Sequence, residues 1–542
     1  MAVSSSSTKK AFSSTTADQA QDEHRKITKN AGVVAAGTFT SRLLGLLRDQ
    51  VIAALFTRAT TDVFFVAFTI PNVLRQLVAE GAVQNAVLPV LERVRESKGE
   101  AEAKSAFASM RGLSLVVLAA ITVAGVVFAP QLVGLFAAGY RQFPGQFERT
   151  VRLTRFLFPY IFFMGTAALG VAALNVCRRF TVTSFAPGLL NIAFVLCGLT
   201  LPAWFRLHGE DPVLALAVAA LLGGALQVVA QWPSLRAVGY FGWPRLNLRD
   251  YAVRETLRRM GPVLLGIGIY YIDVVLARRF LSNLDVGSQS YFSWAMRLCD
   301  FPQGIFVMAL QSATLPSLSR LVARNDLEVA AETFAHGMRL TLWITVAATV
   351  GAIALAQPLI ALVFQRGSFD SVATHETAKA FIAQGMGIWT VAAVRQLVAM
   401  YYALGDTKTP VKVAAIDLLA FIASAQLLSS RFGHVGVSFA VSIASLTQML
   451  LLWFGLRNRL PKLHLRNVLK TLAQSTLLAV IAAIAARRVA FTTATMGFHT
   501  WRQHVFPGLL GSLTFCCVFL LLAWALKCQE LNALRPSRRR QP

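Results

Sequence analysis

Two segments near the start of the chain, "SRLLGLLRDQVIAALF" (41–56) and "TDVFFVAFTIPNVLRQLVAEGA" (61–82), decide the fold. Each belongs to an apolar run of about 20 or more residues, the length that an α-helix needs to cross a hydrocarbon core of roughly 30 Å. Both runs nevertheless contain arginine and carboxylate side chains. An arginine at the centre of a membrane helix costs roughly 2.5–3.5 kcal/mol, so it persists mainly where it faces water or a partner. We therefore expect membrane helices whose charges have a function.

The composition agrees with a membrane protein. The 542 residues are 55% hydrophobic and 14% charged, with a mean hydropathy of +0.56, whereas soluble proteins carry about a quarter charged residues. Apolar stretches recur along the whole chain, so the sequence predicts an all-α polytopic membrane protein with about fourteen transmembrane helices. The predicted spans are 31–57, 63–91, 108–136, 153–176, 184–205, 212–232, 260–281, 288–318, 336–364, 378–404, 410–430, 434–456, 468–486 and 506–526.

The distribution of positive charge predicts the orientation. A net charge of +26 can mark a nucleic-acid-binding surface, but here the basic residues concentrate in the connections on the side of the two termini. The positive-inside rule then places both termini in the cytoplasm. Residues 1–27 are polar and lack the apolar core of a secretory signal. They are expected to form a disordered cytoplasmic tail, with a transit peptide as the alternative.

The sequence contains no motif of an enzyme or a metal centre. Its six cysteines show no metal-ligand spacing and no disulfide framework. Phosphate-binding loops, Ser/His/Asp arrangements and H-E-x-x-H patterns are absent from the sequence. A transporter without a resident cofactor is therefore expected rather than an enzyme.

An internal repeat predicts the organisation of the spans. The segments "NAVLPVL" (85–91) and "SATLPSL" (312–318) place Pro89 and Pro316 227 residues apart. An offset of 226 aligns "LNVCRRFTVTS" (174–184) with "MYYALGDTKTP" (400–410). Six predicted spans separate the members of each pair. Two pseudo-symmetric six-helix lobes are expected, unless the similarity is chance among leucine-rich helices.

Transporters built from such repeats place the substrate between lobes and alternate access by rocking. The predicted domains are a cytoplasmic tail (1–27), an N-terminal lobe (28–240), a C-terminal lobe (241–458), two additional transmembrane helices (459–528) and a basic cytoplasmic tail (529–542).

Charged side chains inside the spans are the candidate functional residues. The intramembrane arginines are Arg42, Arg48, Arg75, Arg297 and Arg395, and the accompanying acids are Asp49, Asp62, Glu80, Asp273, Asp300 and Asp417. Helical spacing places Arg42 and Asp49 on one face, whereas Arg48 has no obvious partner in its helix. Arg297 and Asp300 are i and i+3 and can touch, and Pro302 is expected to kink or loosen the helix just after them.

Two explanations of these arginines stay open. In the first, neighbouring carboxylates neutralise them and pin helices together. In the second, the arginines converge on a central cationic cavity. Their planar, permanently charged guanidinium groups suit bidentate binding of a phosphate or diphosphate.

At these residues the sequence resembles the MurJ (MviN) family, lipid II flippases of the multidrug/oligosaccharidyl-lipid/polysaccharide (MOP) exporter superfamily. The matching pieces are "SRLLGLLRD", "TDVFFVAFTIPNVLRQLVAEGA", "FQRGSFD" (364–370) and "YYALGDTKTPVKVA" (401–414), which occur in the family's order. The resemblance covers roughly residues 28–526.

The resemblance implies movement of undecaprenyl-diphosphate-linked peptidoglycan precursor from the cytoplasmic to the outer leaflet of the bacterial inner membrane, in cell-wall biogenesis and cell shape. Lipid II and membrane lipids are the implied partners, with cell-wall synthesis proteins possible and no nucleic acid. The predicted substrate-binding residues are Arg42, Arg48, Asp62, Arg75, Glu80, Arg297, Asp300 and Arg395. The sequence departs from the family at Met296, where members typically carry an acid directly before the arginine.

Energy coupling is predicted from intramembrane acids. Asp273 and Asp417, with Ser445 and Thr447, are candidates for binding Na⁺ or a proton, and structural hydrogen bonding is the alternative. The membrane potential alone is a further driving force, since moving one charge through 100 mV is worth about 2.3 kcal/mol.

Three other functions compete with lipid II flipping. One is a flippase for another polyprenyl-linked glycan, which shares the diphosphate. Another is a cation-coupled drug antiporter of the same superfamily, which needs an acidic rather than arginine-rich cavity. The third is a membrane scaffold that transports nothing and tolerates alanine at Arg48 or Arg297.

Overall fold

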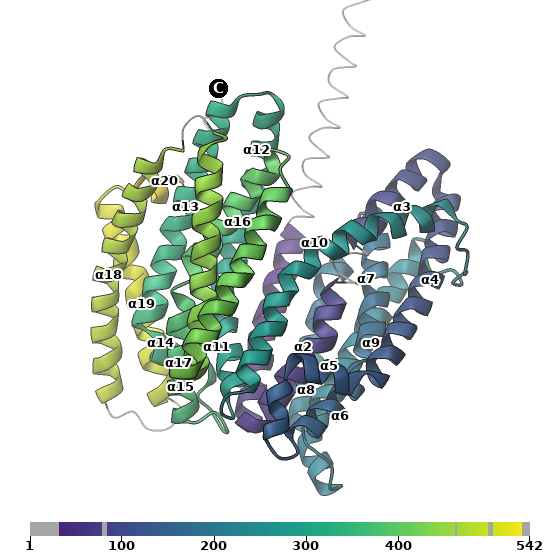
Figure 1. The fold of residues 1–542 in the computed structure, drawn as a ribbon, viewed down its shortest axis with the longest axis horizontal. Helices are drawn as coiled ribbons and strands as arrows, with labels where there is room; N and C mark the ends of the chain where they lie inside the picture. Colours follow the sequence, from purple (N-terminus) through teal and green to yellow (C-terminus); the bar gives the residue numbers. More distant parts are fainter. Residues whose placement is uncertain (1–31, 78–83, 461–462, 497–501, 534–542) are drawn as a thin grey trace, which may run out of the picture. The chain divides into compact units, whose positions relative to one another are not determined.

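The computed structural model describes residues 32–77, 84–460, 463–496 and 502–533, and in these ranges the chain is helical without a β-strand (Figure 1). The predicted site residue Glu80 and the predicted tails 1–27 and 534–542 lie outside the described residues. The chain divides into two compact units. The first unit comprises the described parts of Met1–Ile52, Pro71–Ala129 and Leu153–Leu265, and the second those of Ala53–Ile70, Pro130–Arg152 and Gly266–Pro542.

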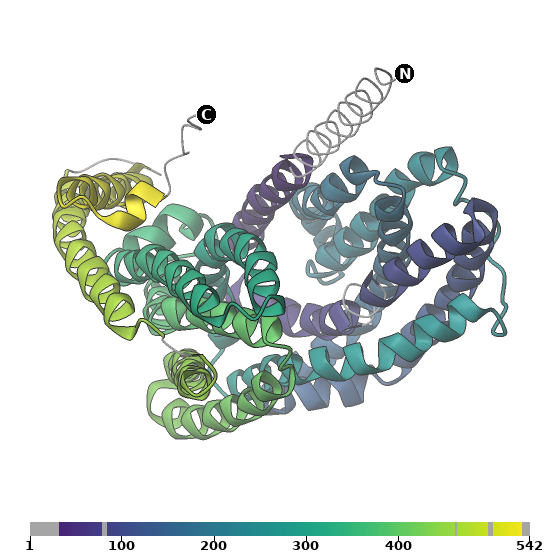
Figure 2. The same cartoon turned by 90° about the horizontal axis from the view of Figure 1, so that it is seen from above.

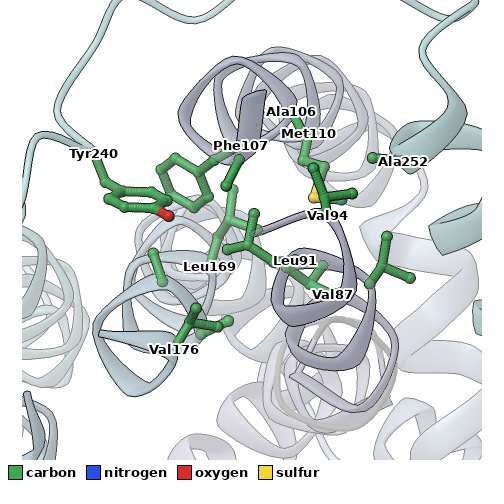
Figure 3. Packing of buried hydrophobic residues seen from close by; sticks show 14 of the residues in the cluster. Val87, Leu91, Val94, Ala106, Phe107, Met110, Leu169, Val176, Tyr240 and Ala252 are labelled. Carbon is green, nitrogen blue, oxygen red and sulfur yellow. The ribbon is translucent and has the colours of Figure 1, made fainter. Parts of the chain in front are cut away.

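The first unit is built mainly from long apolar helices. After a first helix over residues 32–55, its helices are the end of α2 (Arg58–Arg75), α3 (Gln84–Lys98), α4 (Glu100–Val127), α7 (Tyr160–Val176), α8 (Phe180–Leu207), α9 (Leu214–Ala237) and the start of α10 (Tyr251–Ser282). Figure 3 shows one of its cores, where Leu91 of α3, Phe107 of α4 and Leu169 of α7 pack together. Tyr240 closes this core with its ring 5.4 Å from that of Phe107.

The second unit holds the remaining helices. They are α5 (Ala129–Phe136), η2 (Ala138–Gln142), α6 (Gln146–Leu157), α11 (Ser288–Pro302), η3 (Gln303–Val307), α12 (Met308–Ala323), α13 (Leu327–Ala354), α14 (Ala356–Phe364), α15 (Ser371–Gly385), α16 (Ile388–Ala403), α17 (Lys408–Arg457), α18 (Leu465–Thr495), α19 (Arg502–Ala525) and α20 (Gln529–Ala533). Helices α18 and α19 lie side by side (Figures 1 and 2). They pack on α13 through a core that includes Trp343, Ala482 and Phe519.

Each predicted span coincides with helical segments of the structure. By length and apolar composition, nine helices within the described ranges can cross a membrane. One of these nine, α17, contains two predicted spans, because its backbone leaves the helical conformation at Gly433 (φ 55°, ψ −134°) between 410–430 and 434–456. Glycine adopts this conformation without the clash that a Cβ causes.

The backbone also bears out the internal repeat. Arg178 and Gly405 have positive φ angles of 55° and 77°, and they are separated by the same 227 residues as Pro89 and Pro316. The N–H of the following residue bonds back five positions in both places, from Arg179 to Leu174 and from Asp406 to Tyr401.

Four further pairs of positive-φ residues recur at offsets of 222 to 226, namely Gly99 with Asn325, Gly145 with Gly367, Gly209 with Gly433 and Gly239 with His464. Turns that repeat at one spacing are not expected from chance similarity among leucine-rich helices. The two six-helix repeats followed by α18 and α19 are therefore the architecture of the chain.

Pro302 loosens its helix as expected. α11 ends at Pro302 and continues as a five-residue π-helical segment, Gln303–Val307, before α12 begins. A proline lacks the N–H of a regular helix and clashes with the preceding turn, and π segments recur at functional positions in helices.

Candidate substrate and ion sites

Arg48 lies in the first helix and has a buried ion pair. Its Nε and Nη2 atoms lie 2.8 and 2.7 Å from Oδ1 of Asp49, and the two side chains are 13% and 3% exposed. Nη1 donates to Oδ1 of Asn191 on α8 at 3.0 Å, and the guanidinium lies over the Phe194 ring. The expectation that Arg48 has no partner in its helix is wrong. Adjacent positions point about 100° apart, but the long arginine side chain folds back to reach its neighbour.

Asn191 fixes this site to the backbone. Its Nδ2 atom donates to the carbonyl of Ser41 at 3.0 Å, while its Oδ1 accepts from Arg48. Gly45 faces the same amide at about 3.7 Å. Breaking a buried ion pair by removing one partner costs about 3–5 kcal/mol, because the other charge stays buried. The Arg48 guanidinium is thus held in one position before any ligand arrives.

The other predicted arginines of the first unit are less constrained. Arg42 is half-buried. Arg75 ends α2 and donates through Nε to Oδ1 of Asn72 at 3.0 Å. Its predicted acidic neighbour Glu80 is outside the described residues, so the expected arrangement of these two charges stays a prediction.

Asp62 has a structural position. This buried side chain of α2 accepts hydrogen bonds from the backbone N–H groups of Gly287 (2.6 Å) and Ser290 (2.8 Å) and from the Ser290 hydroxyl (2.6 Å). Gly287 is the N-cap of α11, where N–H groups lack helical partners and the helix dipole favours an anion. Asp62 therefore caps α11 from another helix, and its carboxylate is occupied by these contacts.

Arg297 and Asp300 lie in the last turns of α11, and both residues are exposed. They are three positions apart and directly precede the π-helical segment that begins at Gln303. Met296, which occupies the position where an acid was expected, lines a cavity in the second unit.

That cavity has a volume of about 490 Å³ and brings together residues of α10, α16 and α17. Its charged lining consists of Asp273 and Arg278 from α10, Arg395 from α16 and Asp417 from α17. One buried carboxylate oxygen of Asp273 and one of Asp417 accept no hydrogen bond from any group that the structure describes. In the same part of the chain, the Arg395 guanidinium has no ion-pair partner. The prediction placed three of these four residues at functional sites, and the structure brings them into one cavity.

The predicted hydroxyl partners divide. Ser445 lines the cavity, with its Oγ 2.6 Å from the Thr390 hydroxyl and 3.0 Å from the Ser442 carbonyl. The Thr447 hydroxyl instead donates to the carbonyl of Ile443 at 3.0 Å, and Thr447 is not among the residues that line the cavity. Among the described residues, no group of three or more His, Cys, Asp or Glu side chains could hold a metal ion.

Arg278 is the residue that the sequence did not reveal. Its Nη1 donates to Oε1 of Gln289 (2.9 Å) and to the Ser293 hydroxyl (2.7 Å), and the guanidinium lies over the Phe65 ring. In the sequence, Arg278 stands beside Arg279 at the end of a span, where paired basic residues usually reflect topology. Only the position of Gln289 and Ser293 on α11 marks it as part of the cavity.

Repeated helical units, buried charged side chains and a charged cavity within the helices define a polytopic membrane transporter. The fold agrees with solved structures of such proteins. It is similar to "Lipid II flippase MurJ, inward closed conformation" (TM-score 0.74, 23% identity, covering 91% of this chain and 99% of that one). It is also similar to an inward-facing multidrug resistance MATE family transporter of the MOP superfamily (TM-score 0.63, 15% identity, 77% and 94%).

The family is shown by the sequence. The profile of the family "Lipid II flippase MurJ" matches residues 51–506. A Vibrio cholerae protein named "Probable lipid II flippase MurJ" is 31% identical over 529 residues, which cover 94% of this chain and 98% of the relative. The "Lipid II flippase MurJ" of Burkholderia cenocepacia is 32% identical over 431 residues, covering 79% and 83%. The chain belongs to the lipid II flippase MurJ family, and it is a transporter rather than an enzyme.

Proposed function

We propose that this protein moves lipid II, the undecaprenyl-diphosphate-linked peptidoglycan precursor, from the cytoplasmic to the outer leaflet of the bacterial inner membrane. The observation that carries the proposal is the similarity over almost the full chain to proteins named as lipid II flippases. In this proposal both termini lie in the cytoplasm, and the two repeats alternate access to the two leaflets.

Arginines bind the diphosphate in this proposal. The proposed residues are Arg42, Arg48 and Arg75 of the first unit and Arg297, Arg395 and Arg278 of the second. Arg48 supports the proposal most directly. An arginine has five N–H donors, and the contacts to Asp49 and Asn191 use three of them. Two N–H groups of a positioned guanidinium are left for a ligand, so little conformational entropy is lost when an anion binds.

The acids of the second unit couple a cation to the cycle in this proposal. Asp273 and Asp417 each have a buried oxygen without a hydrogen bond in the cavity that Ser445 also lines. A buried carboxylate without a partner is costly, and Na⁺ or a proton at this position relieves that cost. Arg395, at the wall of the same cavity, makes the net charge there depend on both the cation and the anionic substrate.

The test is the amount of lipid II exposed on the outer leaflet of cells depleted of this protein, measured with an added enzyme that cleaves only exposed precursor. We expect exposure to collapse on depletion and to return with wild type but not with Arg48→Ala or Arg297→Ala. Arg297 is exposed, so its variant tests function without removing a buried ion pair. Arg488→Ala is the control, because Arg488 is exposed and is not among the proposed arginines.

All variants must be present at equal levels in the membrane. Unchanged exposure on depletion, in cells without a second flippase, would contradict lipid II as the substrate. Full rescue by both arginine variants would contradict the diphosphate site while leaving the substrate standing.

A further inference from the structure

A second cavity lies in the second unit, away from the acids and arginines described above. It has a volume of about 760 Å³ and is formed where α13 ends and α14 begins, together with parts of α15, α18 and α19. Its polar lining consists of His375, Lys379, Arg487, His504, Gln357, Gln365 and Gln503. The described lining contains no aspartate or glutamate. We call this cavity the α14–α19 cleft.

The positive groups of the cleft are only partly neutralised by the protein. The Lys379 ammonium lies 2.9 Å from a carboxylate oxygen of Glu376. By contrast, neither Arg487 nor His504 has an ion pair or a hydrogen bond within the residues that the structure describes. Arg487 is exposed and His504 is half-buried. The cleft therefore presents guanidinium and imidazole donors that an anion can take.

The remaining lining is apolar. Phe491 of α18 is 69% exposed, and Ala494, Ile382 and Pro507 extend the apolar surface. The base of the cleft is held by close packing, because a Cβ on Gly508 of α19 would lie 2.4 Å from the carbonyl oxygen of Pro358 on α14. A basic rim above a fixed apolar base complements an amphiphile with an anionic head.

The depth of Arg487 in the membrane fits a lipid phosphate. α18 is long enough to span the bilayer and ends at Thr495, eight residues after Arg487. At a rise of 1.5 Å per residue this is roughly 12 Å along the helix. A long basic side chain reaches from such a position to the headgroup level while its methylene groups stay on apolar surface.

We propose that the α14–α19 cleft binds an anionic phospholipid, with the phosphate on Arg487 and His504, assisted by Lys379, and an acyl chain along Phe491. The bound lipid braces α18 and α19 against α14 and α15. This site is separate from the arginines proposed to bind the transported precursor, and its test does not depend on the transported substrate.

The experiment measures lipid binding to the delipidated, full-length protein in detergent by native mass spectrometry. The probes are palmitoyl-oleoyl phosphatidylglycerol and, as the zwitterionic control, palmitoyl-oleoyl phosphatidylcholine. The test variant is Arg487→Gln combined with His504→Gln. The matched control is Arg488→Gln, since Arg488 is the next residue of the same helix and exposed, but it does not line the cleft.

We expect wild type to prefer phosphatidylglycerol, the double variant to lose about tenfold in affinity for it, and Arg488→Gln to lose less than about twofold. Equal losses for the two arginine positions, or equal binding of both lipids, would overturn the proposal. Inorganic phosphate is added as a competitor. Displacement of the lipid at millimolar phosphate would show a site for a free anion, and it would overturn the choice of a lipid.

Discussion

Two groups of acids in the second unit differ in how the protein satisfies them. The Asp62 carboxylate accepts three hydrogen bonds, two of them from the N-terminal backbone of α11. Asp273 and Asp417 each keep a buried oxygen without a described donor, in a cavity that also contains two arginines. Burying a polar group without a partner is costly. The comparison teaches that an intramembrane acid is not by itself a functional site. Its unused hydrogen-bonding capacity separates a ligand site from a structural cap.

The largest effect on folding is expected at Asp62. Asp62→Ala leaves the N–H groups of Gly287 and Ser290 without their acceptor and removes the cap of α11. We expect a loss of about 2–4 kcal/mol in the free energy of unfolding, seen as a large fall in melting temperature and in the amount of protein in the membrane. If Asp62→Ala is as stable as wild type but inactive, the assignment of Asp62 as a cap is wrong.

The opposite result is expected at the unsatisfied acids. Asp417→Asn and Asp273→Asn should leave the melting temperature near that of wild type but reduce lipid II transport about tenfold or more, an activation free energy of about 1.4 kcal/mol. A cation that binds only the folded protein raises stability by RT ln(1 + [L]/Kd). Na⁺ should therefore raise the melting temperature of wild type and not of the variants. Variants that unfold while transporting normally would erase the contrast with Asp62.

Arg395 sharpens the comparison from the side of the positive charge. Removing a guanidinium from the cavity of Asp273 and Asp417 takes away a charge that repels a cation. Arg395→Gln should therefore bind Na⁺ several-fold more tightly, measured by isothermal titration calorimetry on purified protein. The control is Arg488→Gln, which lies outside this cavity. Unchanged or weaker Na⁺ binding in Arg395→Gln would show that the acids and this arginine do not act on one another.

The smallest effect concerns an acid outside the membrane spans. Hydrogen bonds from the hydroxyl and backbone of Thr409 hold the pKa of Asp406 below its usual value, and Arg459 adds an ion pair at 2.7 Å. A lowered folded-state pKa contributes stability that is present above the unfolded pKa near 3.9 and is lost as the pH falls through the folded value. Wild type should thus exceed Asp406→Asn slightly in melting temperature at pH 6. A difference that persists unchanged below about pH 3 would contradict this contribution.

Patterns local in sequence predicted the fold well. Apolar length placed the helices, the offset near 227 predicted the repeat, and Pro302 predicted the loosened helix because its effect depends on its own ring. The positive-φ turns at Arg178 and Gly405 then recurred at the same offset. Each of these features depends on a few consecutive residues.

The candidate sites were predicted less completely, because their chemistry depends on contacts between distant helices. Nothing in the sequence around Asp62 shows that α11 begins beside it, 225 residues later. Arg278 has the same limitation, since Gln289 and Ser293 identify its position only after folding. The Arg48 pair was missed for a different reason, since helical spacing describes where a side chain starts and not how far a long one reaches.

The most direct test of the account is flipping of lipid II by the purified protein in proteoliposomes, followed by access of an external cleaving enzyme to lipid supplied inside. We predict flipping by wild type, flipping reduced about tenfold or more by Arg48→Gln and by Arg297→Gln, and normal flipping by Arg488→Gln. Equal rates in wild type and both test variants, at equal reconstitution, would contradict the claim that these arginines carry the diphosphate. No flipping by wild type under any imposed Na⁺ gradient, pH gradient or membrane potential would contradict the proposed function itself.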